Sequence, residues 1–374
     1  MTTFKLYGTW KRLLAQWRPD ECHTRVTNLA WLIVGLYVSQ RIQTTAIVKR
    51  WKIAVKVPSL TRRLSRFLDN PAIRPAVWFR PVAKQLLARA AQQTLTLIVD
   101  ASKVGAGQQL VIVALAYKKR ALPLAWTWVA YAKGAIATDV QVALFKRVQG
   151  LLPDGARVIL VGDAGFSSVL VLRQLEAWSW QYVLRQKGSS RLQRAGQTVW
   201  ERLDALLTGA GQQVWLPGVS FTAQWAHVTQ VLALWQAGYE RPWLLTTNLT
   251  DARTARQAYA RRMWIEEMFG DWKGHGWDLE TTHLRHPDRL SRLVLALALL
   301  YIWLVLGGEQ LIKAGLRAEV DRADRRDLSL FRIGLDTLQR CFTLERKLPI
   351  SFPSLVGAAR VSFAQPGRLS SIRM

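Results

Sequence analysis

Hydrophobic residues follow two different patterns along the chain, and the pattern changes near Thr94. Before that point apolar residues recur at helical spacing, and Leu60, Leu64 and Leu68 line one face of such a stretch. From Thr94 onward, short apolar runs rich in β-branched residues are typical of strands. We therefore expect a helical region over residues 1–93, followed by a part that mixes strands and helices.

The apolar runs after Thr94 predict a mixed sheet covered by helices. Leu95–Asp100 and Arg157–Asp163 each form a short, apolar, β-branched run that ends in a carboxylate. Lys118–Arg120 separates two further apolar runs and predicts a hairpin turn. In chain order, we expect strands at 95–100, 110–117 and 121–129, a helix at 138–150, a strand at 157–163, a helix at 167–178 and a strand at 180–185. This order predicts an α/β fold class, with an α+β mixed sheet.

The second half of the chain departs from this rhythm and then returns to it. Residues 188–242 contain short alternating runs rich in tryptophan, which predict an antiparallel β insertion. Trp243 begins one more predicted strand, and a helix capped by Asp251 follows and continues through 259–273. The apolar run 293–306 is shorter than the ~20 residues of a membrane-spanning helix, so we expect a buried core helix there.

The charge of the chain narrows the class of partner. Lysine and arginine number 52 against 25 aspartate and glutamate, a formal net charge of +27. An excess of this size favours a polyanionic partner, nucleic acid first and an anionic membrane surface second. A short basic helix carrying Arg62, Arg63 and Arg66 could be a DNA-recognition element, and the alternative is a solvated face of an ordinary helical bundle.

Cysteine usage indicates the cellular compartment. Cys22 and Cys341 are the only two cysteines, which excludes a disulfide framework and a cysteine zinc site. This usage fits a reducing cytosol, and residues 1–17 lack the apolar core of a signal peptide. We therefore expect a cytoplasmic protein without a membrane partner.

Carboxylates follow two of the predicted strands at positions suited to chemistry. Asp100 and Asp163 each come at the carboxyl end of an apolar strand, where a following loop exposes the side chain. Either aspartate alone is a weak signal, because strand-end aspartates commonly cap turns. Together with one more carboxylate they could hold two divalent cations, and Mg²⁺ suits such a site because it prefers oxygen ligands.

The third carboxylate comes from the helix predicted over 259–273. At about 100° per residue, Tyr259, Arg262, Glu266 and Lys273 fall within about 60° of one another on one face. This stripe carries one carboxylate and groups that bind phosphate. The apolar residues between them, Met263, Ile265 and Phe269, are expected to pack inward. The alternative is an exposed helix stabilised by an Arg262–Glu266 ion pair.

These residues together carry a resemblance to a known family. The chain resembles a DDE transposase of a bacterial insertion sequence, of the group with the signature Y-x2-R-x3-E-x6-K. Tyr259, Arg262, Glu266 and Lys273 match that spacing without adjustment, and the contexts of the two aspartates are also similar. The resemblance covers roughly residues 94–310. One departure is Ala164, where many relatives carry arginine, which puts a local substrate contact in doubt.

The resemblance implies an RNase H-like catalytic core interrupted by the β-rich insertion, and a cut-and-paste reaction. Asp100, Asp163 and Glu266 would be catalytic and would ligate two Mg²⁺ ions, with Mn²⁺ as a substitute. Water would first cut at the end of the element, and the freed 3′-hydroxyl would then attack target DNA. The implied partners are transposon-end DNA, target DNA and a second copy of the chain in a synaptic homodimer.

The resemblance also implies DNA contacts around the metal site. Tyr259, Arg262 and Lys273 would position phosphates of the end DNA, a role that the charges of Arg262 and Lys273 support independently. Some relatives stack a flipped base on a tryptophan of the insertion, and Trp243 is the residue that we map there. An ordinary core position for Trp243 is the alternative that the sequence favours.

The resulting organisation has five parts. We expect a helical DNA-binding region at 1–93, the core at 94–187, the insertion at 188–242, the rest of the core with the signature helix at 243–310, and a helical C-terminal region at 311–374. Two other functions stay open: a catalytically inactive DNA-binding relative that inhibits transposition, and a stand-alone RNase H-like nuclease. The first would bind ends without cutting, and the second would cut without strand transfer.

Overall fold

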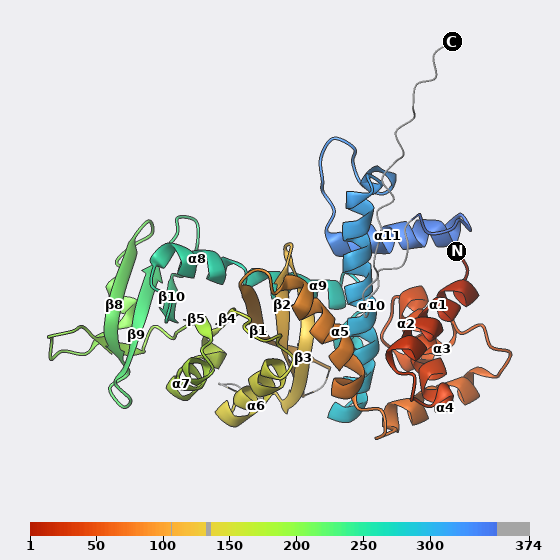
Figure 1. Ribbon diagram of the computed structural model, residues 1–374, viewed down its shortest axis with the longest axis horizontal. Helices are drawn as coiled ribbons and strands as arrows, with labels where there is room; N and C mark the ends of the chain where they lie inside the picture. Colours follow the sequence, from red (N-terminus) through yellow and green to blue (C-terminus); the bar gives the residue numbers. More distant parts are fainter. Residues whose placement is uncertain (106, 132–135, 350–374) are drawn as a thin grey trace, which may run out of the picture.

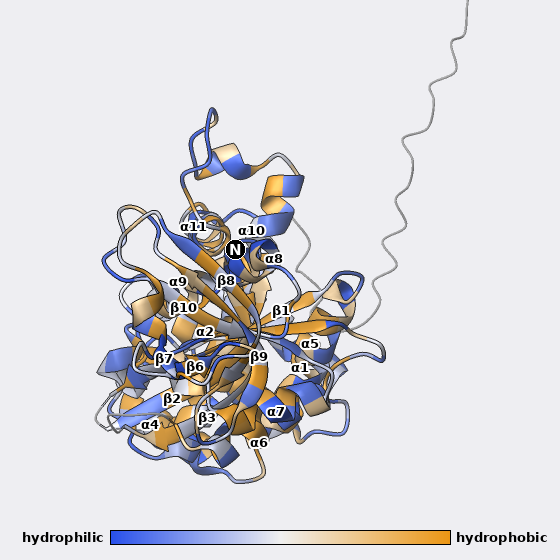
Figure 2. Ribbon diagram, turned by 90° about the vertical axis from the view of Figure 1, so that its left-hand side faces the viewer, coloured by the Kyte–Doolittle hydropathy of each residue, from blue (hydrophilic) through white to orange (hydrophobic). Residues whose placement is uncertain are grey.

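The computed structural model describes residues 1–105, 107–131 and 136–349. The helices of residues 3–69 lie at one end of the long axis, the central strands lie in the middle, and the strands of residues 191–234 lie at the other end (Figure 1). The hydropathy colouring of Figure 2 places much of the apolar sequence on the strands and helices in the middle of the molecule. The structure is a mixed α/β fold with helical ends, as the sequence predicts.

The N-terminal region is helical, as predicted. Its helices are α1 Thr3–Trp17, α2 His23–Ser39, α3 Thr44–Val48, α4 Val57–Asp69 and α5 Pro75–Ala90. Gly35 in α2 allows α3 to approach closely, because a Cβ atom there would lie 2.6 Å from Cγ2 of Ile47 and 2.8 Å from Nε1 of Trp51. Helix α2 also contacts α10 Pro287–Lys313, which joins the N-terminal region to the rest of the protein.

The central sheet has ten strands in the order β3-β2-β1-β4-β5-β10-β9-β8-β6-β7. Its first five strands in the chain are β1 Leu95–Val104, β2 Gln108–Tyr117, β3 Arg120–Ala130, β4 Val158–Gly162 and β5 Gln181–Arg185. Strands β1, β4 and β5 run parallel to one another. Strand β2 pairs antiparallel with β1, and β3 pairs antiparallel with β2. Lys118 and Lys119, both with positive φ, form the predicted hairpin turn between β2 and β3, and Arg120 already belongs to the strand.

The stretch 188–242 contains the predicted antiparallel strands, but they do not form a separate sheet. They are β6 Arg191–Gln193, β7 Glu201–Arg202, β8 Gln213–Phe221 and β9 His227–Leu234. Strand β10 Trp243–Thr247 pairs with β9 on one side and with β5 on the other, so the insertion continues the core sheet.

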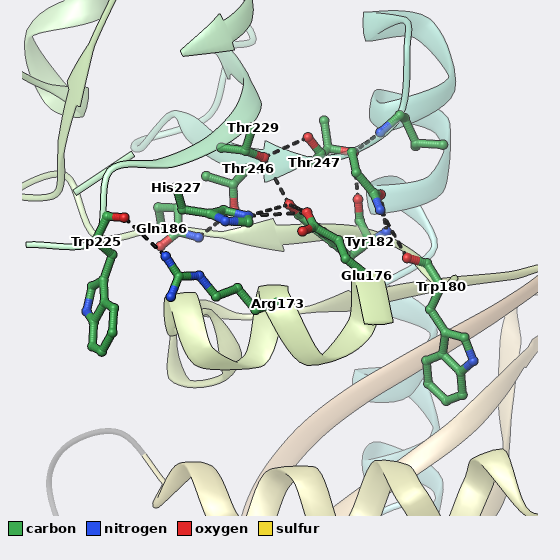
Figure 3. Close-up of polar contacts among 12 residues, drawn as sticks. Arg173, Glu176, Trp180, Tyr182, Gln186, Trp225, His227, Thr229, Thr246 and Thr247 are labelled. Atoms are coloured by element: carbon green, nitrogen blue, oxygen red, sulfur yellow. Dashed lines mark hydrogen bonds and ion pairs between the residues drawn. The ribbon is translucent and has the colours of Figure 1, made fainter. Parts of the chain in front are cut away.

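A buried polar cluster fastens the insertion to the core at this junction (Figure 3). The hydroxyl of Tyr182 on β5 donates to Oε1 of Glu176 at 2.9 Å and lies 3.0 Å from Oγ1 of Thr229 on β9. Nε2 of His227 lies 3.2 Å from the same carboxylate, and Thr229 donates to the carbonyl of Thr247 on β10 at 2.9 Å. One cluster therefore links α7 Val169–Ala177 with three neighbouring strands.

The remaining helices cover the sheet and its edge. They are α6 Thr138–Gln149, α8 Ala252–Ala260, α9 Met263–Trp272 and α11 Leu330–Thr343, with short 3₁₀ turns at Ala164–Phe166, Leu203–Leu206, Leu279–Thr281 and Arg317–Glu319. By length and composition α10, 27 residues long, could cross a membrane, but 89% of its most apolar window is buried inside the protein. This confirms the predicted core helix.

Candidate active site

Asp100 and Asp163 lie side by side where the pairing of β1 with β4 ends. Strands β1 and β4 are parallel neighbours in which Val99 pairs with Gly162, and the two aspartates are the next residues on each strand. A Cβ atom at Gly162 would lie 2.6 Å from Cγ1 of Val99, so glycine permits this close pairing. The expectation that β1 ends at Asp100 is wrong, because the hairpin with β2 extends β1 to Val104 while the pairing with β4 stops at Val99.

The signature stretch is not one continuous helix, contrary to the sequence prediction. Helix α8 ends at Ala260 and α9 begins at Met263. Between them the backbone tightens to three-residue hydrogen bonds, with the N–H of Arg262 donating to the carbonyl of Tyr259 at 2.9 Å and that of Ile265 to Arg262 at 3.2 Å. This break changes the helical phase that the prediction assumed between Tyr259 and the residues after it.

Arg262 joins two of the predicted metal ligands. Its Nη1 lies 2.5 Å from Oε1 of Glu266, and its Nη2 lies 3.3 Å from Oδ2 of Asp100. The side chains of Arg262 and Asp100 are only 13% and 15% exposed, whereas that of Glu266 is 46% exposed. The Arg262–Glu266 ion pair of the alternative hypothesis therefore exists. It does not stand alone on a solvated face, because the same guanidinium also pairs with the buried Asp100.

The three carboxylates lie close enough to affect one another electrostatically. The pKa of Asp100 is raised to about 6, chiefly by burial and also by the charges of Asp163 and Glu266, against the opposing effects of Arg262 and of the Ala101 N–H. That N–H donates to Oδ1 of Asp100 at 2.8 Å. The site thus concentrates negative charge in a partly desolvated place, which a cation stabilises.

The donor set suits a hard divalent cation, although Arg262 stands in the way of one. All three carboxylates offer oxygen ligands, the type that Mg²⁺ prefers. In the described parts of the chain no group of three His, Cys, Asp or Glu side chains is close enough to hold a metal ion. The guanidinium of Arg262 lies between Asp100 and Glu266 and supplies the positive charge there.

Tyr259 and Trp243 lie together beside these carboxylates. Their rings make an edge-to-face contact, with centroids 4.9 Å apart and an interplanar angle of 73°. Burial raises the pKa of Tyr259 to about 12, against the opposing effects of Arg262 and Arg185. Trp243 is partly buried and packs on the core, as the core interpretation expects. It also contacts Tyr259 of the signature, as the DNA-contact interpretation requires.

Lys273 pairs with a carboxylate outside the signature. It is the residue after α9, and its Nζ lies 2.5 Å from Oε1 of Glu280. Ile265 and Phe269 are buried as predicted, but Met263 is 48% exposed, so that part of the packing prediction is wrong. Within α9 Met263 lies about 200° around the helix axis from Ile265, so a helix that buries Ile265 and Phe269 turns Met263 outward.

The family can be stated on sequence as well as on geometry. Residues 92–303 match the family described as Transposase DDE domain. The chain belongs to this family. The chemistry of DDE transposases is phosphoryl transfer in DNA transposition, and they typically use divalent metal ions.

A solved structure similar to this DDE transposase-family chain is described as "Cryo-EM structure of piggyBac transposase synaptic complex with hairpin DNA (SNHP)". It shares 10% sequence identity, with a TM-score of 0.43, over 89% of this chain and 76% of that one. No curated protein sequence matches the chain.

Two features of this DDE site are missed by sequence reasoning. The first is Arg185, the last residue of β5. Its charge lowers the pKa of Tyr259, and its Nη2 donates to the carbonyl of Pro242 at 3.1 Å. A basic residue at the end of the strand next to β4 is a signal that could have found it. Ala164, the position that departs from many relatives, follows Asp163 and begins a short 3₁₀ turn.

The second missed feature is a charged network on the opposite side of α9. Nε of Arg120 lies 2.9 Å from Oδ2 of Asp271, and its Nη1 lies 3.1 Å from Oε2 of Glu267. The buried hydroxyl of Tyr301 donates to the same Asp271 oxygen at 3.2 Å. Glu267 therefore points away from the carboxylate site, in keeping with its position about 100° around the helix from Glu266. Arg120 connects α9 to the sheet through both carboxylates.

Proposed function

We propose that this protein is an active DNA transposase that cuts at the ends of its element and joins them to target DNA. The observation that carries the proposal is the pair of aspartates, Asp100 and Asp163, on adjacent parallel strands with Glu266 held across Arg262. Membership of the transposase DDE domain family supports the same reaction class.

The sheet supports an RNase H-like core. Its strand order begins β3-β2-β1-β4-β5, with three parallel strands and an antiparallel hairpin at the edge. The β-rich stretch between β5 and β10 is the insertion of the proposed core, and Glu266 follows it on α9. The proposed division is therefore the core at 94–187 and 243–310, separated by the insertion at 188–242.

In the proposed site Asp100, Asp163 and Glu266 would hold two Mg²⁺ ions, or Mn²⁺ in their place. Bound ions of this kind stabilise the charge that develops on a transferring phosphoryl group and lower the pKa of a bound water. Arg262 pairs with both Asp100 and Glu266 and favours the ionised form of Asp100, the charge state that a cation needs; a bound cation would take over this pairing.

The phosphate contacts proposed for Arg262 have support in its hydrogen bonding. Its Nε is buried and has no hydrogen-bond partner among the described residues, so the hydrogen bonding of the guanidinium is incomplete within the protein. Tyr259 lies close enough to Arg262 for the guanidinium charge to lower the pKa of its phenol. We propose that Tyr259, Arg262 and Lys273 contact the end DNA. Trp243 is proposed to stack on a base there, since its ring packs on Tyr259.

The remaining assignments follow from charge and reaction class. The formal charge of +27 supports the proposed partners, transposon-end DNA and target DNA. Holding two ends together for joining requires a synaptic complex, for which we propose a homodimer. The N-terminal helices, including the exposed Arg62 and Arg66 on α4, are the proposed DNA-binding region. The proposed location is the cytoplasm, on the nucleoid when bound to DNA.

Cleavage of duplex DNA that carries the terminal inverted repeats flanking the coding region tests this function. Replacing Asp100, Asp163 or Glu266 by alanine is expected to lower Mg²⁺-dependent cleavage about a thousandfold or more, because a catalytic metal is worth several kcal/mol. End binding, measured by gel shift, should persist. Asp154→Asn, at an exposed carboxylate in a loop, is the matched control and should cleave as the wild type does.

The same assay separates the alternatives. Undiminished cleavage by any of the three alanine variants would contradict the proposed site. Binding of ends by the wild type, with no cleavage in Mg²⁺ or Mn²⁺, would indicate an inactive DNA-binding relative. Cleavage without joining to a second DNA would indicate a nuclease.

A further inference from the structure

A basic cavity lies at the edge of the sheet, apart from the carboxylate site. It has a volume of about 620 Å³ and is enclosed by the start of α5, the middle of β3, the end of α6 and the start of α10. We propose that this cavity binds a phosphate ester, and that its source is the backbone of DNA bound by the protein.

The charges around the cavity are almost all of one sign. Five cationic side chains line it against one carboxylate: Arg74, Arg80, Lys146, Arg147 and Arg292 against Asp288. The side chain of Asp288 is 86% exposed, so most of it faces solvent. A concave surface with this balance concentrates positive potential and attracts an anion.

Arg292 gives the cavity a buried, fixed guanidinium in addition to its surface lysines and arginines. The residue is only 5% exposed, and its Nε and Nη1 donate to the carbonyls of Ile73 and Leu68 at 3.0 and 2.8 Å. Its Nη2 lies 3.9 Å from Oδ2 of Asp288, too far for a hydrogen bond. These bonds fix the guanidinium and leave one nitrogen available to a ligand in the cavity.

Arg147 adds a second partly desolvated guanidinium from α6. Its Nη2 donates to the carbonyl of Trp126 on β3 at 2.9 Å, and burial lowers its pKa below the ordinary value. A carbonyl compensates a buried guanidinium less well than an anion does. Among the described residues Arg74, Arg80 and Lys146 form no ion pair, so an anion would not have to displace a protein carboxylate from them.

The cavity also offers neutral contacts that fit a nucleotide. Helix α5 begins at Pro75, and Ala76 in its first turn lines the cavity; N–H groups of a first helical turn have no acceptor inside the helix. Leu124 and Trp126 form an apolar wall, and Trp126 is held by an edge-to-face contact with Phe79 at 5.1 Å. A phosphate with a sugar beside it would match these two surfaces.

The position of the cavity favours DNA over a free nucleotide as the source of the phosphate. Asp100 pairs with Ile112, which pairs with Trp126, so one row of the sheet connects the carboxylate site with the cavity wall. Two strand spacings separate the backbones, roughly 10 Å. A DNA strand engaged at Asp100 would therefore lie about two strand spacings from this edge of the sheet. The partner is that of the proposed function, but the phosphate site does not depend on cleavage.

Charge reversal at the rim tests the inference in the full-length protein. Arg80→Glu and Lys146→Glu change exposed side chains on two different helices that face the cavity. Lys84→Glu, on α5 but outside the cavity lining, is the matched control. Affinity for a random-sequence duplex is measured by fluorescence anisotropy between about 50 and 200 mM salt, and each lost phosphate contact should lower the slope of log K against log salt by about 0.9.

Calorimetric titration with dAMP and with inorganic phosphate forms the second arm. A smaller salt slope for Arg80→Glu and Lys146→Glu, with an unchanged slope for Lys84→Glu, supports the phosphate site and DNA as its source. Loss of dAMP or phosphate binding in the two rim variants, with DNA affinity unchanged, supports the site and assigns it to a free phosphate ester. Wild-type behaviour of both rim variants toward all three probes overturns the inference, as does an equal loss in Lys84→Glu.

The outcome is independent of the carboxylate site. In the Asp100→Ala background the rim variants should show the same reduction of the salt slope, whether or not the protein cleaves DNA. Retained rim effects without any wild-type cleavage would leave the phosphate site standing and would overturn only the proposed activity.

Discussion

At the scale of single residues, Arg262 is the group on which the charge balance of the carboxylate site depends. It is the cation paired with both Asp100 and Glu266, and it comes from a break between two helices rather than from a helix interior. Burial already raises the pKa of Asp100 to about 6 with this guanidinium present. The site therefore stores unfavourable electrostatic energy that its own arginine only partly offsets.

Replacing this arginine by methionine should destabilise the protein through the charge left behind. We expect Arg262→Met to lower the free energy of unfolding by about 2–3 kcal/mol at pH 8, because a largely buried Asp100 loses its partner. Asp100→Asn in the same background should recover most of the loss, since it removes the uncompensated charge. Urea unfolding of the two single variants and the double variant measures this coupling. Additive losses would show that Arg262 stabilises the fold through packing alone.

Asp271 provides a test of pH dependence away from the carboxylate site. Burial raises its pKa to about 6; Glu267 raises it as well, while Arg120, Tyr301 and His275 lower it. Between about pH 4 and pH 6 the folded protein binds this proton more strongly than the unfolded chain does. The stability contributed by the protonated carboxyl is therefore present below about pH 4 and is lost as pH rises through 6.

Asp271→Asn should remove that dependence. Relative to the wild type, the variant is expected to gain up to about 3 kcal/mol of unfolding free energy between pH 4 and pH 7, because the pKa shift is about two units. Urea unfolding at the two pH values measures the gain. His275→Gln keeps the carboxyl and should retain most of the wild-type dependence, and an equal difference between wild type and Asp271→Asn at both pH values would contradict the assignment.

At the scale of elements, the crossing of α10 and α11 depends on two glycines. A Cβ atom at Gly334 would lie 2.1 Å from the carbonyl oxygen of Leu304, and one at Gly308 would lie 2.0 Å from that of Leu330. Both obstacles are backbone atoms, which cannot move aside as a flexible side chain can. The two helices therefore approach each other closely only because these positions carry no side chain.

Alanine at Gly334 should separate the two helices. We expect Gly334→Ala to lower the free energy of unfolding by about 1–3 kcal/mol, the usual cost of overpacking. Gly307→Ala is the matched control, because its Cβ would meet nothing within 4 Å. The control should be neutral or stabilising by up to ~1 kcal/mol through helix propensity. Thermal unfolding followed by circular dichroism measures both, and equal midpoints for the two variants would contradict the crossing.

The elements also show how far sequence reasoning reaches. Apolar runs and turn residues predict the helical N-terminus, the parallel strands, the hairpin at Lys118 and Lys119, and the core helix α10, because each rests on local periodicity. The break at Arg262 is not predicted, since the residues around it are compatible with a helix and tertiary contacts decide the backbone there. Arg262 bonds across to Asp100, which is far away in sequence.

The candidate site divides in the same way. The positions of Asp100 and Asp163 are predictable, because parallel strands end at one edge of a sheet. The pairing of Lys273 with Glu280 is not, since Glu280 lies in the segment beyond the end of α9. The cavity near Arg292 is also invisible to a motif, because its walls come from distant segments, whereas the strand-end position of Arg185 is a signal that the sequence does contain.

At the scale of the whole molecule, one sheet runs from edge strand β3 in the core to edge strand β7 in the insertion. Strand β10 links the two parts by pairing with β5 and β9, and the polar cluster around Tyr182 bridges the same strands. The insertion is therefore mechanically continuous with the strands that carry Asp100 and Asp163. Trp243 reaches Tyr259 because its own strand belongs to both parts.

This continuity predicts how a defect at the junction spreads. Tyr182→Phe removes the hydroxyl that bonds Glu176 and Thr229, at a cost of about 1–2 kcal/mol. Because the sheet is shared, amide protons of β5 and β9 should lose protection against hydrogen exchange together and by similar factors. Thr208→Val, in an exposed loop of the insertion, is the control and should leave both strands protected. Loss of protection confined to β9 would show instead that the insertion opens by itself, and that its tryptophans are positioned independently of the carboxylate site.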